Sequence, residues 1–481
     1  MKTRTYRRLF LALCVAFVLV SRYPCYTGDI LRTDDFFRVA DNARLDAAYF
    51  RTVLLDNRSD SFYRPLNQFT FGLTHRFFDF RPLPYALFNL LLLLGCVWAL
   101  FNVLLALSRS AVFASVSTFG WLLNVEPIHA VLSWGVGRTA SLYTLFVLLA
   151  LGCALRARRS HPAPWLAASM ACLFLALLSK ESAVTGPVLV LALMGAEVAR
   201  GGILRRRHLL GAAAAAALVY GAYFALRSAS HAMTPATAPA FYQLDFSPAV
   251  LARNLAGYLS RSLLYSALLI PAFFLLPRTA DAPSRRRAPR VPRGRAVAVG
   301  LLLFVVAVAP ELAVPSRSSL YAFFPSVFVT ATLAALLAGS GRWPARRSGL
   351  KGLLAMMAAV GLVVAPIAWA RGSSVDRGGA IYRWSRAIAD QVARDRDPVI
   401  ALRYAPGVVE LKPKNLELLR MGVSLILRRP ATIEANPRQE SPRSWKFELR
   451  PGHPGEPDDI RLLSEPEEPP AGRTPEVNAP G

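Results

Sequence analysis

The sequence lacks the cysteine and histidine patterns that build disulfide frameworks and zinc sites. It has only five cysteines and six histidines, with no Cys-x-x-Cys pair and no Cys/His ligand spacing. Four cysteines lie in apolar runs, where cysteine behaves as a small hydrophobe, and Cys25 stands alone in a polar stretch. Neither a disulfide framework nor a zinc site is therefore supported.

The common signatures of soluble enzymes are also missing. The chain contains no Walker loop, no G-x-G-x-x-G after a strand, no G-x-S-x-G and no H-E-x-x-H. We therefore expect no nucleotide cofactor, and ATP-driven transport within this chain is unsupported.

Acidic residues are scarce, since 30 Asp and Glu stand against 56 Lys and Arg, for a net charge of +26. In a soluble chain this excess would suggest nucleic acid. Here most of the arginines gather in short loops between apolar runs, which is the positive-inside pattern of membrane proteins. We therefore expect a membrane around the chain and no nucleic-acid partner.

Long apolar runs dominate the 481 residues, of which 54% are hydrophobic. The first run reaches Val20 without an A-x-A-like cleavage site after it, so we expect it to be retained as a span. The sequence predicts an all-α, multi-pass membrane protein with about eleven transmembrane helices. These spans are 8–23, 85–107, 111–125, 139–155, 163–179, 183–199, 209–226, 250–276, 296–314, 318–340 and 349–370.

Alternate loops between these spans are basic, including the Arg-rich loop 278–295. This alternation places the N-terminus in the cytoplasm and the C-terminus outside, in the cytoplasmic membrane if the cell is bacterial. Each segment of the outer set combines an acid with a base, which suggests a shared polar cavity. The combinations are Asp34/Arg64, Glu126/Arg138, Lys180/Glu181, Asp245/Arg227 and Glu311/Arg317.

The composition changes after about residue 370. A helix is expected over 381–392, and alternating apolar residues predict strands over 398–404 and 445–449. We therefore divide the chain into a transmembrane domain, 1–370, with a long first outer loop, 22–84, and a small C-terminal α/β or irregular module, 371–450. Residues 451–481 are rich in Pro, Glu and Gly and are predicted to be a disordered tail.

The adjacent carboxylates Asp34 and Asp35 follow the first span. A carboxylate near a bilayer is costly unless it is solvated, paired or bound to a metal. The pair would suit a divalent cation, or one member acting as a general base with its pKa tuned by the other. The alternative is a solvated acidic turn before an amphipathic segment.

Several outer-face motifs carry charge near the membrane boundary. The guanidinium of Arg64, beside Tyr63, can bind two phosphate oxygens at once, or it can anchor the chain at the headgroups. Lys180 and Glu181 sit between two apolar runs in what we expect to be a tight interfacial turn. A simple turn could be formed at a lower free-energy cost by Asn, Gly or Ser. The two charged residues therefore favour a role in a cavity.

Two further motifs lie in the later outer segments. Glu126 and His129 belong to the motif EPIH, and Arg138 ends the motif GVGR, where proline and glycine predict a non-helical backbone. For His129 by itself, the role of a hydrogen-bonded core histidine is more ordinary than that of a ligand. Arg317 and Tyr321 lie four residues apart at the start of the tenth span, which predicts one shared helix face or an aromatic-belt anchor.

In this order the motifs resemble those of the C-type (GT-C fold) integral membrane glycosyltransferases that use a polyprenyl-phosphate sugar. The chain looks most like the transmembrane O-mannosyltransferases with lumenal tetratricopeptide repeats and their bacterial relatives. The resemblance runs from Asp34-Asp35 through Tyr63-Arg64 and EPIHAVLSWGVGR to Lys180-Glu181, and covers residues 8–340. The repeats are absent here, and Glu126 replaces the first histidine of the usual His-Pro-x-His.

The resemblance implies a role for each matching position. Asp34 would be the base that takes the acceptor's proton, with Asp35 supporting it or helping to place Mg²⁺ or Mn²⁺. The donor phosphate would be held by Arg64, Arg138, Lys180 and Arg317. A single base opposite the leaving group would invert the anomeric carbon.

The expected function is therefore transfer of mannose or a similar hexose from a polyprenyl-phosphate donor to an acceptor hydroxyl at the extracytoplasmic face. The acceptor would belong to a protein, a glycan or a lipid. Two alternatives stay open at this point: a transporter, polymerase or ligase of lipid-linked glycans, and a non-catalytic membrane scaffold.

The base assignment makes a direct prediction. The variant Asp34→Asn is expected to abolish sugar transfer without reducing the amount of protein inserted in the membrane, because the amide cannot accept the acceptor's proton. Transfer is measured with purified protein and a lipid-phosphate sugar. Full activity of the variant would rule out Asp34 as the base.

Overall fold

The structure is a computed structural model that falls into two compact units. Unit 1 draws on residues 1–30, 42–77 and 81–375, and unit 2 on residues 31–41, 78–80 and 376–481. The residues that it describes are 3–27, 39, 45–55, 62–158, 161–201, 203–232, 242–274, 293–338, 347–373, 379–393, 398–404, 419–421, 423–424, 426–427, 431–435, 444–450 and 459–464.

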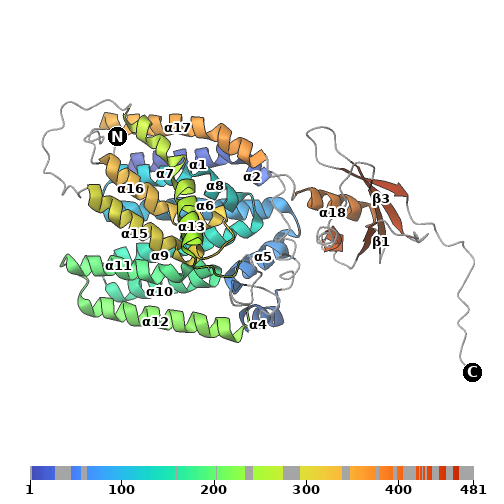
Figure 1. Ribbon diagram of the computed structural model, residues 1–481, viewed down its shortest axis with the longest axis horizontal. Coiled ribbons are helices and arrows are strands. Elements are labelled where there is room, and N and C mark those ends of the chain that lie inside the picture. The colour runs from blue at the N-terminus through green and yellow to red at the C-terminus, as the bar shows by residue number, and fades with distance from the viewer. Residues whose placement is uncertain are drawn as a thin grey trace, which may run out of the picture. The chain divides into compact units, whose positions relative to one another are not determined.

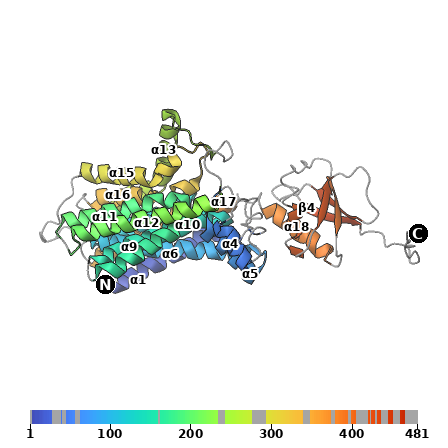
Figure 2. The same cartoon turned by 90° about the horizontal axis from the view of Figure 1, so that it is seen from below.

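Unit 1 is a bundle of helices, most of which run side by side (Figures 1 and 2). Its α-helices are α1 (Thr3–Ser21), α2 (Tyr23–Thr27), α4 (Ala47–Leu55), α5 (Pro65–Phe78), α6 (Pro82–Ser108), α7 (Ala111–Leu122), α8 (Val125–Leu132), α9 (Arg138–Ala157), α10 (Pro162–Ser179), α11 (Gly186–Ala199), α12 (Arg206–Ala229), α13 (Pro248–Leu263), α14 (Leu269–Phe274), α15 (Arg293–Leu312), α16 (Ser326–Ala338) and α17 (Arg347–Ser373). Short 3-10 turns are η1 (Gly135–Gly137), η2 (Glu181–Thr185), η4 (Ser266–Leu268) and η5 (Ser319–Ala322).

The long helices pack in the order α12, α10, α9, α6, α7, α16 and α15, and α1 lies between α7 and α17. Because short connections join most neighbours, successive helices run in opposite directions. Two contacts show which helix ends lie together. Arg7, near the start of α1, donates a hydrogen bond to Asn102 near the end of α6, and Arg158, just after α9, donates one to Glu197 near the end of α11. We call this end, which holds the start of α1, the basic end of unit 1.

Helix boundaries follow the local sequence. Proline at the start of α6 suits the first turn, where a backbone N–H has no partner. The helix ends at Arg109, which adopts a left-handed conformation with φ 56°. The side chain of Ser110 then caps α7 by accepting a hydrogen bond from the Phe113 backbone N–H.

One of the predicted spans is broken, and another is followed by a sharp bend. The predicted span 111–125 corresponds to α7, and the chain continues after a bend of 67° around Asn124 into α8, which lies in the predicted outer segment. The predicted span 250–276 is divided into α13, η4 and α14, and α13 lies across its neighbours in both views (Figures 1 and 2). The long outer loop predicted over 22–84 contains α2, α4 and α5, so its described parts are largely helical.

Among the described residues, seven helices are long and apolar enough to cross a membrane, and the bent pair α7–α8 would add an eighth. The count of about eleven spans is therefore not confirmed. Three of the predicted spans are not long and apolar enough to be counted. Helix α1 begins with several arginines, α13 ends after 16 residues, and α16 has 13 residues.

Asn89 and Gly137 fix the turn between α8 and α9. Asn89 Nδ2 donates to the carbonyl oxygens of Val131 at 3.1 Å and Trp134 at 2.9 Å. A Cβ on Gly137 would lie 2.4 Å from the Val131 carbonyl oxygen, so no larger residue fits. The non-helical backbone predicted here was wrong, because Glu126 to His129 lie in α8 and the glycines form the 3-10 turn η1; only Trp134 between them is extended. This 3-10 turn leads directly into Arg138 in the first turn of α9.

Unit 2 contains α18 (Gly379–Gln391) and a sheet of β1 (Val399–Tyr404), β2 (Thr432–Ala435), β3 (Trp445–Arg450) and β4 (Asp459–Ser464). The strand order is β2-β1-β3-β4, with β1 parallel to β2 and β3, and β4 antiparallel to β3. The helix and both strands expected from the sequence are present. Strand β4 lies within the range predicted as a disordered tail, because its alternating residues complete the edge of the sheet; residues 465–481 lie outside the described part of the chain.

The close approach at Gly137 makes a prediction. Gly137→Ala should destabilise the protein by about 1–3 kcal/mol, because the new methyl group collides with backbone that cannot move without breaking the Asn89 hydrogen bonds. Thermal unfolding in detergent measures the change. The control Gly211→Ala, in α12 with nothing within 4 Å of the new carbon, should be neutral or slightly stabilising. Equal midpoints for the two variants would contradict the prediction.

Candidate functional site

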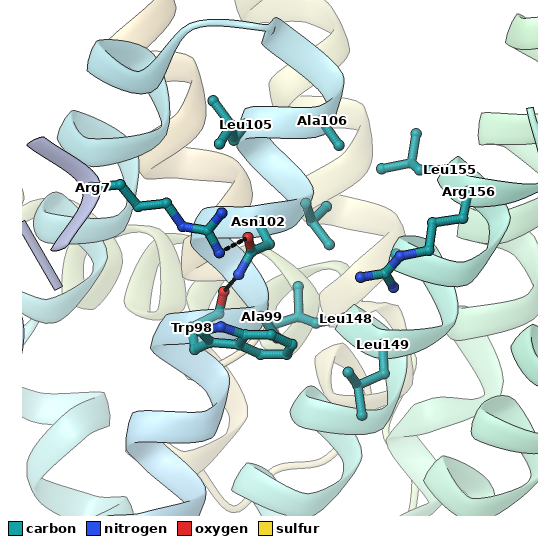
Figure 3. A pocket seen from close by; sticks show the side chains of 12 residues that line it. Arg7, Trp98, Ala99, Asn102, Leu105, Ala106, Leu148, Leu149, Leu155 and Arg156 are labelled. Carbon is teal, nitrogen blue, oxygen red and sulfur yellow. Dashed lines mark hydrogen bonds between the residues drawn. The ribbon is translucent and has the colours of Figure 1, made fainter. Parts of the chain in front are cut away.

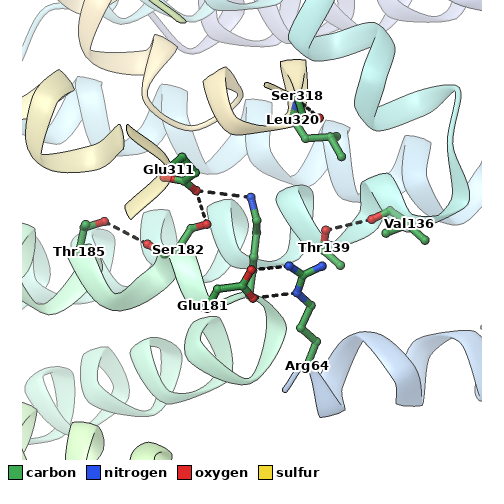
Figure 4. A network of polar contacts seen from close by, with 10 residues as sticks. Arg64, Val136, Thr139, Glu181, Ser182, Thr185, Glu311, Ser318 and Leu320 are labelled. Carbon is green, nitrogen blue, oxygen red and sulfur yellow. Dashed lines mark hydrogen bonds and ion pairs between the residues drawn. The ribbon is translucent and has the colours of Figure 1, made fainter. Parts of the chain in front are cut away.

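Lys180 and Glu181 occupy a break between two apolar helices. Helix α10 ends at Ser179, Lys180 is extended with φ −162° and ψ 138°, and η2 starts at Glu181. The extended residue turns the two side chains to different partners. Lys180 faces Glu311 at the end of α15, while Glu181 faces Arg64 just before α5 (Figure 4).

The pair of Arg64 and Glu181 is bidentate. Arg64 Nε donates to Glu181 Oε2 at 2.8 Å, and Nη2 donates to Oε1. The guanidinium carbon of Arg64 lies 4.2 Å from the centre of the Phe62 ring, so this ring covers one face of the guanidinium plane. The arginine side chain is 11% exposed and the glutamate side chain 30%, so the pair is partly accessible.

The pair of Lys180 and Glu311 is more deeply buried. The Lys180 Nζ lies 3.6 Å from Glu311 Oε1, and Ser182 Oγ donates a hydrogen bond to the same oxygen. The amine also lies 4.6 Å from the ring centre of Tyr321 and 5.3 Å from that of Tyr143, which are cation–π distances. Burial lowers the pKa of Lys180 from its usual value, while the neighbouring carboxylates raise it.

Arg64, Lys180, Glu181, Ser182 and Glu311 form what we call the polar cluster. Helix ends from α5, α10 and α15 supply it, at the end of unit 1 opposite the basic end. Its two cations and two carboxylates balance, which lowers the cost of burying each charge. A bound anion could draw on the Arg64 fork, the Lys180 amine and the Ser182 hydroxyl, the types of group that stabilise phosphate.

Tyr63, Glu126 and His129 lie near the same helix ends but make other contacts. The Tyr63 hydroxyl donates to the Leu54 carbonyl oxygen at 3.2 Å. Glu126 forms an ion pair with Arg371 at 3.2 Å. His129 is buried, with Nε2 3.2 Å from the Ser133 hydroxyl oxygen and Nδ1 3.6 Å from the Cys25 sulfur.

Arg138 is held away from the polar cluster. Its Nη1 donates to the Thr70 carbonyl oxygen at 3.2 Å and to Thr74 Oγ1 at 3.3 Å, which ties α9 to α5. The rings of Phe71 and Phe88 lie 4.1 and 4.8 Å from its guanidinium carbon. The described contacts of Arg138 are therefore those of a clamp between helices, and its predicted role in holding phosphate stays a prediction.

Two details of the sequence analysis were wrong. Arg317 and Tyr321 do not share a helix face, because Arg317 is an exposed residue before η5 and α16 begins only at Ser326. Cys25 is not in a polar loop but is buried in α2 against His129. A third point is that the described ion pairs join different segments: Arg64 with Glu181, Lys180 with Glu311, and Glu126 with Arg371. The combination of Asp34 with Arg64 stays a prediction, because Asp34 lies outside the described residues.

Asp34 and Asp35, the predicted base and metal ligands, lie outside the described residues. Among the residues that the structure does describe, no three or more His, Cys, Asp or Glu side chains gather into a possible metal site. The Asp34–Asp35 pair thus stays the predicted place for a divalent cation.

Sequence reasoning missed the importance of Ser182, Glu311 and Arg22. Glu311 was noted only as a neighbour of Arg317, and its apolar surroundings were the available signal that it needed a cation. Arg22 follows directly on α1 and is fully buried, and among the described residues its terminal nitrogens have no hydrogen-bond partner.

Comparison with known proteins gives structural likeness only. No protein-family model and no curated protein matches the sequence. ArnT from Cupriavidus metallidurans bound to undecaprenyl phosphate is similar with a TM-score of 0.51 and 15% identity, over 90% of this chain and 86% of that one. ArnT in the apo state gives the same values. The apo oligosaccharyltransferase of Archaeoglobus fulgidus has a TM-score of 0.48 and 12% identity, over 92% of this chain and 66% of that one.

The likeness to ArnT shows the fold. The chain is an integral, multi-pass membrane protein, and it has the GT-C fold predicted from the order of its motifs. These two predictions are confirmed, while the resemblance to O-mannosyltransferases in particular stays a prediction.

The buried pair of Lys180 and Glu311 makes a prediction about stability. Lys180→Met should destabilise the protein by about 3–5 kcal/mol, because it leaves the Glu311 carboxylate buried without its cation. Adding Glu311→Gln removes the second charge and should restore most of the loss. Thermal unfolding in detergent measures both variants.

The matched control is Lys351→Met, which changes an exposed lysine in the first turns of α17 and should leave stability nearly unchanged. Equal losses for the single and the double variant would show that Lys180 acts through packing and not as the partner of Glu311.

Proposed function

We propose that the protein is a membrane glycosyltransferase that moves a sugar from a polyprenyl-phosphate donor to an acceptor hydroxyl. The observation that carries this proposal is the pair of buried cations, Arg64 and Lys180, at one end of a bundle with the fold of ArnT. ArnT itself has been solved bound to undecaprenyl phosphate.

The chemistry of this transfer needs positive charge at the phosphate. The bond between the anomeric carbon and the phosphate oxygen breaks, the phosphate keeps the electron pair, and the acceptor oxygen forms the new bond after giving its proton to a base. Fixed cations stabilise the charge that develops on the departing phosphate. We assign this role to Arg64, whose side chain is 11% exposed, and to Lys180.

The polar cluster lies at the helix ends opposite the arginines of the basic end. Because basic loops favour the cytoplasm, this arrangement supports transfer at the extracytoplasmic face. Asp34 is the proposed base, which would give inversion, and Asp35 would tune it or share a divalent cation with it. The donor sugar that we propose is mannose or a similar hexose, and the acceptor is a protein, glycan or lipid.

A donor screen tests the proposal. Purified protein is given radiolabelled polyprenyl-phosphate mannose, glucose or aminoarabinose, and release of the polyprenyl phosphate is scored. We expect release from one of these donors in the presence of an acceptor. Release from none of them would contradict the proposed function.

The role of Arg64 is tested with the preferred donor. Arg64→Lys keeps the charge but loses the two-pronged geometry, so kcat/KM should fall about tenfold to a hundredfold. The control is Arg76→Lys, an exposed arginine on α5, which should keep full activity. Full activity of Arg64→Lys would remove Arg64 from the phosphate site while leaving the transferase assignment intact.

A further inference from the structure

A second cationic site lies at the basic end of unit 1. A pocket of about 220 Å³ opens between α1, α6 and α9. Arg7 of α1 and Arg156 of α9 stand on opposite walls, and their guanidinium groups point towards the space between them (Figure 3). Asn102 and Trp98 of α6 line the pocket between these walls.

Both arginines are supported from the protein side. Arg7 Nη2 donates to Asn102 Oδ1 at 2.7 Å, and Asn102 Nδ2 donates in turn to the Trp98 carbonyl oxygen at 2.7 Å. The guanidinium carbon of Arg156 lies 5.3 Å from the ring centre of Trp165. None of the 12 residues that line the pocket is an Asp or Glu, so its two positive charges are not balanced within it.

The pocket is far from the polar cluster. Arg156 and Arg138 lie near opposite ends of α9, 18 positions apart, which corresponds to a rise of about 27 Å along a helix, and the polar cluster lies at the end of unit 1 where α9 begins. This is close to the roughly 30 Å of hydrocarbon in a bilayer. The pocket therefore lies at the other membrane boundary, where the exposed indole of Trp98 suits the headgroup region.

The remaining walls are apolar, formed by residues such as Leu148, Leu149 and Leu155. A ligand that fits must combine an anionic group for the two guanidiniums with hydrocarbon for the leucines. A phosphodiester headgroup with attached acyl chains has both parts, and anionic lipids are drawn to basic residues at the cytoplasmic surface.

We propose that the pocket of Arg7, Asn102 and Arg156 binds the phosphate headgroup of an anionic phospholipid, at a site separate from the polar cluster. The two guanidiniums share the phosphate oxygens, and the acyl chains run along the leucines of α9. This site does not depend on the proposed transferase activity, and the same chemistry would also recognise free phosphate.

Native mass spectrometry of the delipidated, full-length protein tests the proposal. Phosphatidylglycerol, phosphatidylcholine and inorganic phosphate are titrated separately. We expect tighter binding of phosphatidylglycerol than of the other two. The double variant Arg7→Gln/Arg156→Gln should weaken phosphatidylglycerol binding about tenfold, and Arg156→Gln alone, at an exposed position, should weaken it measurably.

The control is Arg4→Gln/Arg8→Gln, which removes the same charge from exposed positions of α1 outside the pocket and should bind like the wild type. The proposal is overturned if the Arg7/Arg156 variant binds like the wild type, or if the control loses as much affinity. Inorganic phosphate bound as tightly as the lipid would overturn the lipid assignment in favour of a soluble anion.

Discussion

The arrangement of unit 1 depends on one constraint: a charge buried among membrane helices is costly unless an opposite charge or other polar and aromatic groups stabilise it. Lys180 and Glu181 meet it by breaking the chain between α10 and α11. Because Lys180 is extended, two adjacent side chains reach partners on different helices, and one short segment joins α5 and α15 to α10.

This constraint also explains the roles of nearby residues. Ser182 shares the Glu311 oxygen with Lys180, and the Tyr321 ring covers the amine. Tyr321 itself lies in η5, shortly before α16 begins. This 3-10 turn therefore places the tyrosine ring over the Lys180 amine. The described contacts of Arg138 are of another kind, with carbonyl and hydroxyl oxygens and aromatic rings.

Much of the fold could be predicted from the sequence, because apolar length and loop charge are local properties. They gave the multi-pass class and the positions of most helices, and the order of motifs indicated the GT-C fold. The break of 250–276 into α13 and α14 was not predictable from length and hydropathy, since α13 turns across its neighbours only through tertiary packing. The strand β4 was hidden for a similar reason, because its pairing with β3 depends on a strand already formed.

The site was predicted in its residues and not in its contacts. Arg64, Lys180 and Glu181 were recognised as costly charges near the membrane, which a sequence can reveal. Their partners lie far along the chain, 117 positions away for Arg64 and Glu181, and the choice of partner follows from backbone direction at single residues such as Lys180. Sequence spacing therefore suggested Arg317 as the neighbour of Glu311, where the described ion pair is with Lys180.

The two ends of unit 1 handle positive charge in different ways, and burial is the reason. Lys180 is 2% exposed, so its charge must be balanced before any ligand arrives, and Glu311 does this. Arg156 is exposed and Arg7 is partly exposed, so water and headgroups can solvate them without an acid in the pocket. A phosphate at the polar cluster must compete with carboxylates and is selected by geometry, whereas a phosphate in the pocket of Arg7 and Arg156 meets no Asp or Glu in the pocket lining and is held mainly by charge. Binding at the basic end should accordingly be the more sensitive of the two to salt.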